Sequence, residues 1–375
     1  MSGVVVAGAM ANKAGSAGEA WVRLSWVRGF ERLGLDVRFV EELSPTDAPD
    51  PAAVEWFEAI AGRFGLAERA SLLRGEEALA GPSLDELVEF ASHATLVNIS
   101  GHLTLDRLFA AFRQRVMVDI DPGFTQFWHE AGIEGANVGG HDLYFTIGEL
   151  IGTPGCPIPT GGIDWLPVRP PVVLEDWPVA GTSEPERFTT IANWRGPFGP
   201  IEHGGRTYGL KVHEFRKFAS LPRRSPRHFE IALEIHPDDD RDRRALRDHG
   251  WHLVAPREVA GDPDAFRAYV QSSGAEFSVA QGVYVDTACG WFSDRTTRYL
   301  ASGKPVLVQD TGFSQGLPVG EGLVAFTTLD QAAAGAERIA SDYQAHRAAA
   351  RALAEERFDS DKVLPRFLAE AGMGS

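Results

Sequence analysis

The chain has 375 residues, of which 44% are hydrophobic and 23% are charged, and its formal net charge at pH 7 is −16. This composition is typical of a soluble globular protein, and no apolar run approaches the roughly 20 residues that a membrane span requires. The acidic balance argues against broad nucleic-acid binding, which needs a basic face, and the length predicts two domains.

Two features of the sequence bear on the compartment. Residues 1–3 pass directly into an apolar strand, without the basic start and apolar core of a secretory signal, so we expect a cytoplasmic protein. Cys156 and Cys289 are the only cysteines, too few and too isolated for a disulfide framework or a thiolate metal site. We therefore expect two free thiols, and the sequence leaves the oligomeric state open.

Strand-like and helix-like segments alternate along the chain, which is the pattern of a parallel sheet covered by helices on both faces. An apolar strand over 4–7 is followed by a glycine-bearing loop over 8–18, a helix over 19–33 and a second strand over 37–40. The expected fold class is therefore α/β.

Polar residues directly follow the next two predicted strands, 96–99 and 116–120. In open α/β sheets, ligands collect at the carboxyl ends of the strands. His102 follows the first strand, where a histidine suits a general base near neutral pH, and Asp121 follows the second as the alternative base. Each also has a structural interpretation, His102 as a hydrogen-bonding group at a strand end and Asp121 as a turn-forming residue before Pro122.

A third predicted strand, 143–147, is flanked by His141, Asp142 and Glu149, which we rank as secondary residues of the same site. We assign His141 to the acceptor side of that site. Several tryptophans near predicted loop ends could line an apolar acceptor pocket, although packing in the core explains most tryptophans equally well.

Prolines are frequent and periodicity is weak between about 152 and 186, so we interpret this segment as a semi-rigid extended linker. A second α/β series restarts after it. The expected organisation is a first domain over 1–180, a second over 186–355, and a final helix within 356–375 that returns to the first domain.

The second series predicts strands and helices in alternation, with strands at 188–192, 229–234, 251–254 and 275–280 and helices at 210–218, 239–249 and 264–272. The alanine-rich tail from 331 to 372 is predicted to be helical. We expect breaks in it at Phe358-Asp359 and at Pro365.

The stretch 290–312 reads as a glycine-marked loop, a helix, a turn and a buried strand. Ser293 suits the N-cap and Asp294 the first turn, and a helix start offers unpaired N–H groups and the positive dipole end, which together hold a diphosphate. Arg295 and Arg298 lie three apart on one helical face, and an arginine fork matches phosphate oxygens. The alternative is an ordinary αβ unit with solvated arginines.

Two αβ domains, a proline-bearing linker and a phosphate-type loop in the second domain resemble the GT-B glycosyltransferases. The most specific part is 276–312, which is similar to the donor-binding segment of family-four-like bacterial glycosyltransferases through ASGKPV at 301–306 and DTG at 310–312. The turn containing Gly15, Ser16 and Gly18 is similar to the acceptor-side loop that those enzymes place under the reaction centre.

The resemblance implies two Rossmann-like domains facing a cleft and a glycosyltransferase that moves a sugar, expected to be a hexosyl group. The donor would be a nucleoside diphosphate-sugar acting as co-substrate, and the acceptor a hydroxylated small molecule or glycan, with no metal and no cofactor. The paired glutamates of many family-four enzymes are absent, since Gly290 and Arg298 stand at the aligned positions.

The resemblance also implies a pair of cations for the leaving diphosphate, for which Arg195 and Lys211 are the candidates in this sequence. Such a pair stabilises the charge that grows on the leaving group. A lysine at a helix start opposes the dipole, which favours a ligand role for Lys211 over a decorative one.

Other functions stay open at this point. A nucleotide-sugar 2-epimerase or a non-catalytic nucleotide-sugar-binding protein would share the fold. The acidic triplet 238–240 resembles a metal-binding DxD, but it opens an arginine-rich helix, where acidic residues act as caps. A dinucleotide oxidoreductase is the weakest alternative, because neither glycine loop has G-x-G-x-x-G spacing after its strand.

Overall fold

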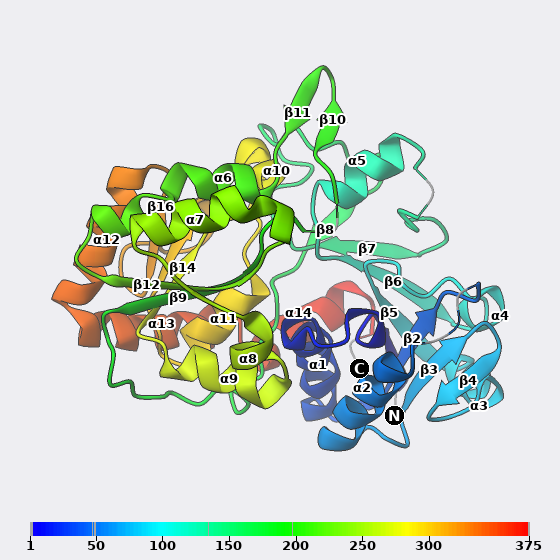
Figure 1. Ribbon diagram of the computed structural model, residues 1–375. Coiled ribbons are helices and arrows are strands. Elements are labelled where there is room, and N and C mark those ends of the chain that lie inside the picture. The colour runs from blue at the N-terminus through cyan, green and yellow to red at the C-terminus, as the bar shows by residue number, and fades with distance from the viewer. Residues whose placement is uncertain (1–2, 47, 49, 134, 197, 374–375) are drawn as a thin grey trace. The chain divides into compact units, whose positions relative to one another are not determined.

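The computed structural model describes residues 3–46, 48, 50–133, 135–196 and 198–373. They form two compact units, each an α/β assembly (Figure 1). Unit 1 comprises Met1–Ile147, Pro159–Val173 and Ser360–Ser375, and unit 2 comprises Gly148–Ile158 and Leu174–Asp359. The predicted fold class, α/β with two Rossmann-like units, is confirmed.

Unit 1 is built on an eight-stranded sheet in the order β4-β3-β2-β1-β5-β6-β7-β8. Every neighbouring pair is parallel except β3 with β4, which is antiparallel. The strands are β1 (Gly3–Ala7), β2 (Asp36–Leu43), β3 (Ala70–Arg74), β4 (Glu77–Ala80), β5 (Ala94–Ile99), β6 (Gln114–Asp119), β7 (Leu143–Thr146) and β8 (Trp165–Pro167).

Helices pack on this sheet and bury its central strands. They are α1 (Ala17–Arg32), α2 (Pro51–Arg63), α3 (Leu84–Ala91), α4 (Asp106–Phe109), α5 (Phe124–Glu130) and α14 (Ser360–Glu370), with a 3-10 turn η1 (Ala11–Lys13). The last helix packs beside the first, because Phe367 lies 5.2 Å from the Trp26 ring and 4.5 Å from the Phe145 ring, between centroids. Residues more than 300 positions apart therefore share one aromatic core.

Unit 2 is built on a six-stranded parallel sheet in the order β13-β12-β9-β14-β15-β16. Its strands are β9 (Arg187–Asn193), β12 (His228–Glu234), β13 (His252–Val254), β14 (Ala275–Ser278), β15 (Val306–Gln309) and β16 (Leu323–Phe326), and β10 (Ile201–His203) with β11 (Arg206–Tyr208) forms a separate hairpin. Phe277 stacks on Phe326 at 5.2 Å in the core of this unit.

The helices of unit 2 alternate with these strands, as the sequence pattern predicts. They are α6 (Lys211–Phe218), α7 (Asp240–His249), α8 (Pro256–Ala260), α9 (Pro263–Ser272), α10 (Gly282–Thr287), α11 (Asp294–Ala301), α12 (Leu329–Ser341) and α13 (Tyr343–Arg357). Neither Cys156 nor Cys289 forms a disulfide in the described part of the chain. Within the described residues no helix has the length and apolar character needed to cross a membrane.

Two predictions about local structure are wrong. The proline-rich stretch is not one extended linker, because residues 148–158 belong to unit 2 and β8 adds a parallel strand to the sheet of unit 1. In the tail, the break at Phe358-Asp359 is confirmed, whereas Pro365 lies inside α14. Burial of Leu364 and Phe367 on either side of Pro365 offsets the hydrogen bond that proline removes.

Candidate functional site

The candidate site lies at the carboxyl ends of β9 and β14 in unit 2, where two helices begin. Lys211 is the first residue of α6, and its backbone N–H donates to Gln281 Oε1 at 2.6 Å. Asp294 is the first residue of α11. The next residue, Arg295, donates hydrogen bonds to residues near the carboxyl ends of both strands. Strand ends and helix starts of this kind form the usual ligand edge of a parallel sheet.

Lys211 is a partly buried cation in this group. Among the described residues its ammonium has no hydrogen-bond or ion-pair partner, and burial, followed by repulsion from Arg295, lowers its pKa to about 7. The carboxylates of Glu276 and Asp294 oppose that shift. A buried and unpaired ammonium calls for an anionic partner, since a paired charge is far less costly to bury.

Arg295 faces into the protein instead of outward. Its Nε donates to Glu276 Oε1 at 2.7 Å, Nη1 to the Ile191 carbonyl at 2.7 Å, and Nη2 to Ser278 Oγ at 2.9 Å. Glu276 is completely buried, so this ion pair is part of the core of unit 2. The Arg295 guanidinium can act as a phosphate fork only by releasing these protein groups, so its predicted donor-binding role stays a prediction.

Arg298 is also turned into the protein. Its side chain is 1% exposed, pairs with Asp294 and lies 5.9 Å from the centre of the Trp177 ring. Spacing along a helix predicts which residues share a face, but it does not say whether that face is exposed. Here the face packs inside unit 2, and the Arg298 guanidinium is already paired with Asp294, so its donor-binding role stays a prediction.

The start of α11 keeps the geometry that a phosphate cradle needs. Ser293 is the N-cap in an extended conformation and makes no side-chain capping bond, while Thr297 N–H donates to the Ser293 carbonyl at 3.2 Å. No partner for the N–H groups of residues 294–296 occurs in the part of the chain that is described. The Thr296 hydroxyl, fully buried, is likewise without a hydrogen bond there. The cradle roles of Ser293 and Asp294 stay predictions.

Gly290 has a structural role that the sequence did not reveal. Its φ is +80°, and a Cβ there would lie 3.0 Å from Leu150 Cγ and 3.2 Å from the Leu150 nitrogen. Leu150 N–H donates to the Cys289 carbonyl at 2.9 Å, and Gly148 bridges to Trp291. Glycine is needed because the backbone of 148–150 approaches the loop before α11, and this accounts for Gly290 without a ligand.

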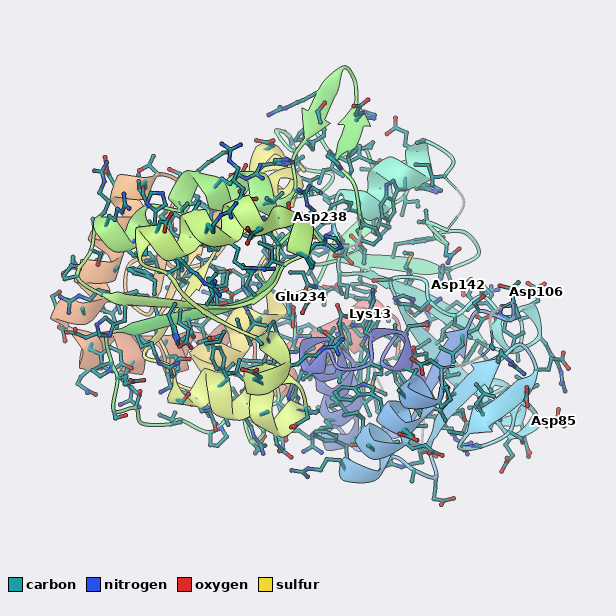
Figure 2. All side chains as sticks on the ribbon, viewed as in Figure 1. Lys13, Asp85, Asp106, Asp142, Glu234 and Asp238 are labelled. Carbon is teal, nitrogen blue, oxygen red and sulfur yellow. The ribbon has the colours of Figure 1, made fainter. Side chains whose placement is uncertain are left out.

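Arg195 follows β9, as predicted, with its fork already occupied. Its side chain is 54% exposed and binds Asp239 through Nε and Nη2, a contact that raises the pKa of Arg195. Asp239 belongs to the acidic turn after β12, which also contains Asp238, labelled in Figure 2. Arg195 can meet a diphosphate only by releasing Asp239, so its donor-binding role stays a prediction.

In unit 1, His102 lies after β5 as predicted, and its imidazole has no hydrogen-bond partner within the described residues. Burial, then Arg23 and then Lys13, lowers the pKa of His102 to about 3. A general base works best with a pKa near the working pH, so this environment disfavours the predicted role of His102 as the base in the free protein.

Asp121 lies two residues after Asp119, a buried residue that connects several elements through hydrogen bonds. Asp119 is fully buried and accepts hydrogen bonds from Thr125 Oγ1 at 2.6 Å and Thr146 Oγ1 at 2.7 Å. It also accepts from Gln126 Nε2 and from Asp121 N–H, and burial raises its pKa. Asp119 thus ties β6 to α5 and β7, while the catalytic role of Asp121 stays a prediction.

His141 has structural partners, and its predicted place on the acceptor side stays a prediction. His141 precedes β7, at the amino end of that strand, and is buried. Its Nε2 lies 3.1 Å from Asn98 Nδ2, its Nδ1 lies 3.1 Å from the Val138 carbonyl, and its ring meets the edge of Phe109. Both ring nitrogens are engaged, which is the pattern of a structural histidine.

The predicted acceptor-side loop is exposed at Gly15 and Ser16. Gly15 has φ +78° with open space at its Cβ position, and Ser16 is the N-cap of α1 without a side-chain capping bond. Gly18 lies in the first turn of that helix, which starts two residues earlier than predicted. Their ligand roles stay predictions.

Sequence reasoning missed Glu41 and Arg23, which shape the loop after β1. The Glu41 carboxylate accepts from the consecutive N–H groups of Met10, Ala11 and Asn12 at 2.6–2.8 Å, and burial raises its pKa. Arg23 is 2% exposed and pairs with Glu19. Charged residues within an apolar strand and on the inner face of a helix were the available indication.

Comparison with known proteins finds structures with a similar fold but no protein with a similar sequence. No family model matches the chain, and no curated protein matches it. Solved structures do. Anabaena HepE in complex with UDP-glucose has a TM-score of 0.60 at 11% identity, covering 99% of this chain and 100% of that one.

Two further structures agree. Sucrose-phosphate synthase from Thermosynechococcus elongatus has a TM-score of 0.54 at 10% identity, over 99% of this chain and 100% of that chain. A glycosyltransferase from Rickettsia africae has a TM-score of 0.56 at 10% identity, over 99% and 97%. The chain has the GT-B fold. The resemblance inferred from the sequence is confirmed at that level.

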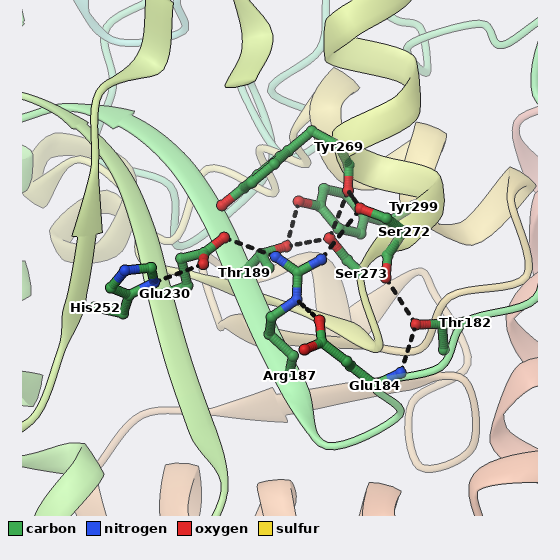
Figure 3. Close-up of polar contacts among 10 residues, drawn as sticks. All are labelled: Thr182, Glu184, Arg187, Thr189, Glu230, His252, Tyr269, Ser272, Ser273 and Tyr299. Atoms are coloured by element: carbon green, nitrogen blue, oxygen red, sulfur yellow. Dashed lines mark hydrogen bonds and ion pairs between the residues drawn. The ribbon is translucent and has the colours of Figure 1, made fainter. Parts of the chain in front are cut away.

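A second polar cluster of this GT-B chain lies at the opposite, amino-terminal edge of the sheet in unit 2 (Figure 3). Glu230 accepts from Arg187 Nη1 at 2.7 Å and lies 2.7 Å from His252 Nδ1, while Thr189 and Tyr299 share a hydrogen bond of 2.7 Å. A cavity of about 530 Å³ opens beside Arg187, Glu230 and His252. Its charges are paired with one another, so we interpret the cluster as a structural clamp between strands.

Proposed function

We propose that the chain is a glycosyltransferase that moves a hexosyl group from a nucleoside diphosphate-sugar to a hydroxylated acceptor without a metal ion. The observation that carries the proposal is the unpartnered ammonium of Lys211 beside the open amino end of α11. The GT-B fold supports it, as do the structures in this fold that contain UDP or UDP-glucose. UDP is accordingly the first donor nucleotide to test.

Lys211 and the N–H groups at the start of α11 would hold the diphosphate. Negative charge grows on the diphosphate as the bond to the sugar breaks, and a fixed cation with oriented dipoles stabilises that charge more than the ground state. These groups could supply the stabilisation that a metal ion gives elsewhere. Turnover that persists in EDTA would support this part of the proposal, and its complete loss would contradict it.

Arg295 is a positioning residue in this scheme. It links Ile191 near the end of β9 to Ser278 at the end of β14, and after burial its repulsion is the next cause that lowers the pKa of the Lys211 ammonium. A bound diphosphate reverses that balance, because its negative charge favours the protonated lysine.

Calorimetric titration with UDP, dTDP, GDP and ADP tests the proposal. Selective binding of one nucleotide is expected, with the dissociation constant raised roughly ten- to hundredfold in Lys211→Met, the loss expected for a charge-assisted contact. Lys217→Met is the matched control, since Lys217 lies on the same helix and pairs with Glu214. Equal binding by Lys211→Met would remove the central residue of the proposal.

Turnover distinguishes the alternatives. With the selected nucleotide-sugar, release of nucleoside diphosphate that depends on an added hydroxylated acceptor supports transfer. Conversion of the donor without an acceptor would instead identify an epimerase, and binding without turnover across a broad acceptor panel would identify a non-catalytic binding protein.

A further inference from the structure

The cavity beside the polar cluster of Figure 3 lies within unit 2, at the amino-terminal edge of its sheet. Its volume is about 530 Å³, and pockets for small molecules usually measure about 300–1,000 Å³. Loops before β9, β12 and β13 and the first residues of these strands line it. The lining side chains that carry charge or titrate are Glu184, Arg187, Arg227, His228, Glu230 and His252.

The strand register places four of these side chains on one face of the sheet. Residues that pair across parallel strands project from the same face, as do residues two apart along one strand. Arg187 pairs with His228 between β9 and β12, and Glu230 pairs with His252 between β12 and β13. The three strands therefore hold a single polar surface whose spacing is fixed by the backbone hydrogen bonds.

Ion pairs balance the charges of this surface. Glu230 Oε1 accepts from Arg187 Nη1 at 2.7 Å, and Arg187 Nε lies 2.9 Å from Glu184 Oε2. Arg227 pairs with Glu337 beside the cavity. An anionic ligand must displace a carboxylate and a cationic ligand must displace an arginine, so a charged ligand gains little over the existing pairs. The cavity therefore favours a neutral ligand.

The paired groups keep hydrogen-bonding capacity for such a ligand. A guanidinium has five N–H groups, and each carboxylate oxygen can accept more than one hydrogen bond. Arg187 directs three of its N–H groups to Glu184, Glu230 and Ser272, which leaves two. The exposed imidazole of His228 has no partner within the described residues. Donors and acceptors therefore alternate on this wall, and adjacent hydroxyl groups of a ligand can bind both kinds.

The cavity also has an apolar side. Pro222 and Pro226 line it together with Phe229. Proline rings and the flat faces of imidazoles pack against C–H groups, each contact adding a small dispersion energy. A neutral ring that carries several hydroxyl groups and C–H groups on its faces uses both sides of the cavity.

We propose that this cavity of unit 2 binds a neutral saccharide, either a free sugar or one unit of a glycan chain. Its hydroxyl groups donate to Glu230 and accept from Arg187, and its ring lies against the imidazoles of His228 and His252. The cavity is at the opposite end of the strands from Lys211, so the inference goes beyond the proposed function and does not depend on it.

NMR titration of the full chain with sugars tests the proposal. Glucose, galactose, maltose and maltopentaose are the neutral probes, and glucuronate and glucosamine are the charged ones. The imidazole resonances of His228 and His252, assigned by their absence in His228→Gln and His252→Gln, report on this cavity alone. A sugar bound at the Lys211 site leaves them unchanged.

We expect at least one neutral sugar to shift both resonances with a dissociation constant of about 1–10 mM, the affinity typical of so small a ligand. The charged sugars should bind at least threefold more weakly. Tighter binding of maltopentaose than of maltose would identify a glycan chain as the occupant, and equal binding would identify a free sugar.

Two variants change exposed side chains of the cavity, so that the fold is preserved. Glu184, 60% exposed, pairs with Arg187, and Glu184→Gln leaves a surplus positive charge. Glucuronate should then bind at least threefold more tightly than to the unaltered chain. His252, 71% exposed, lies 2.7 Å from Glu230 through Nδ1, and His252→Ala should weaken the neutral sugar at least threefold. His236→Ala, at an exposed histidine outside the cavity, is the control.

Circular dichroism of each variant establishes that it folds. The proposal is overturned if no neutral sugar shifts the two imidazole resonances at about 50 mM. It is also overturned if glucuronate or glucosamine binds the unaltered chain as tightly as the neutral sugars do. The same conclusion follows if Glu184→Gln and His252→Ala behave like His236→Ala.

Discussion

At the scale of single residues, Lys211 is the group whose charge we expect to decide how a donor binds. Its pKa of about 7 means that the free protein loses this charge as the pH rises above 7, whereas the complex with a diphosphate keeps it. Binding must then take up a proton above pH 7. We expect the UDP dissociation constant to rise by up to about tenfold for each pH unit above 7.

Titration calorimetry between pH 6 and 9 in buffers of different ionisation enthalpy checks this expectation. UDP is fully ionised over the upper part of that range, so the change reports the protein. Lys211→Met should show a flat dependence above pH 7. An unchanged slope in that variant would assign the proton to another group.

Arg295 contributes to the free energy of unfolding through its buried ion pair. Arg295→Met leaves the Glu276 carboxylate, which is completely buried, without its partner. Removing one member of a buried ion pair costs about 3–5 kcal/mol of unfolding free energy. Arg267→Met breaks a more exposed pair with Asp264 and should cost less than about 1 kcal/mol in the same urea titration.

The double variant Arg295→Met with Glu276→Gln completes this test. It removes both charges, so it should be markedly less destabilised than the sum of the single changes. Simple additivity would show that the two side chains act independently.

At the scale of elements, the loop before α11 packs closely against the neighbouring segment 148–150. This close contact requires glycine at position 290. Gly290→Ala puts a Cβ 3.0 Å from Leu150 Cγ at a φ of +80°. We expect a loss of about 1–3 kcal/mol and weaker UDP binding, because the start of α11 shifts with its loop. Gly205→Ala is the control, because Gly205 has a φ of +75° but no atom near the position of an added Cβ. Urea unfolding and UDP titration of both variants separate the cost of the backbone conformation from the cost of the Leu150 contact. Equal effects would assign no role to the Leu150 contact.

At the scale of the whole molecule, unit 1 is completed by the last helix of the chain. Phe367 is 2% exposed and packs against Trp26 and Phe145. Phe367→Ala should cost about 3–5 kcal/mol and lower the calorimetric transition of unit 1. UDP binding, assigned to unit 2, should persist above that transition for as long as unit 2 stays folded. Loss of nucleotide binding together with the folding of unit 1, while unit 2 remains folded, would contradict this assignment.

The alternation of apolar strands and amphipathic helices was sufficient to predict the α/β fold, and the resemblance carried by the segment 276–312 predicted the GT-B architecture. Local chemistry also predicted the Ser293 N-cap and the start of α6 at Lys211, because capping and turn preferences act within a few residues. The break at Phe358-Asp359 was predicted for the same reason.

The direction of charged side chains was decided only by the tertiary structure. Arg295 turns inward to Glu276, 19 residues away on β14, and Arg298 is buried beside Trp177, more than 100 residues away. His141 is engaged by Asn98 across the sheet. Helical spacing placed both arginines on one face, but burial of that face depends on long-range partners. The sequence by itself therefore determined the elements and their order, and the packing of distant partners determined which polar groups remain free for a ligand.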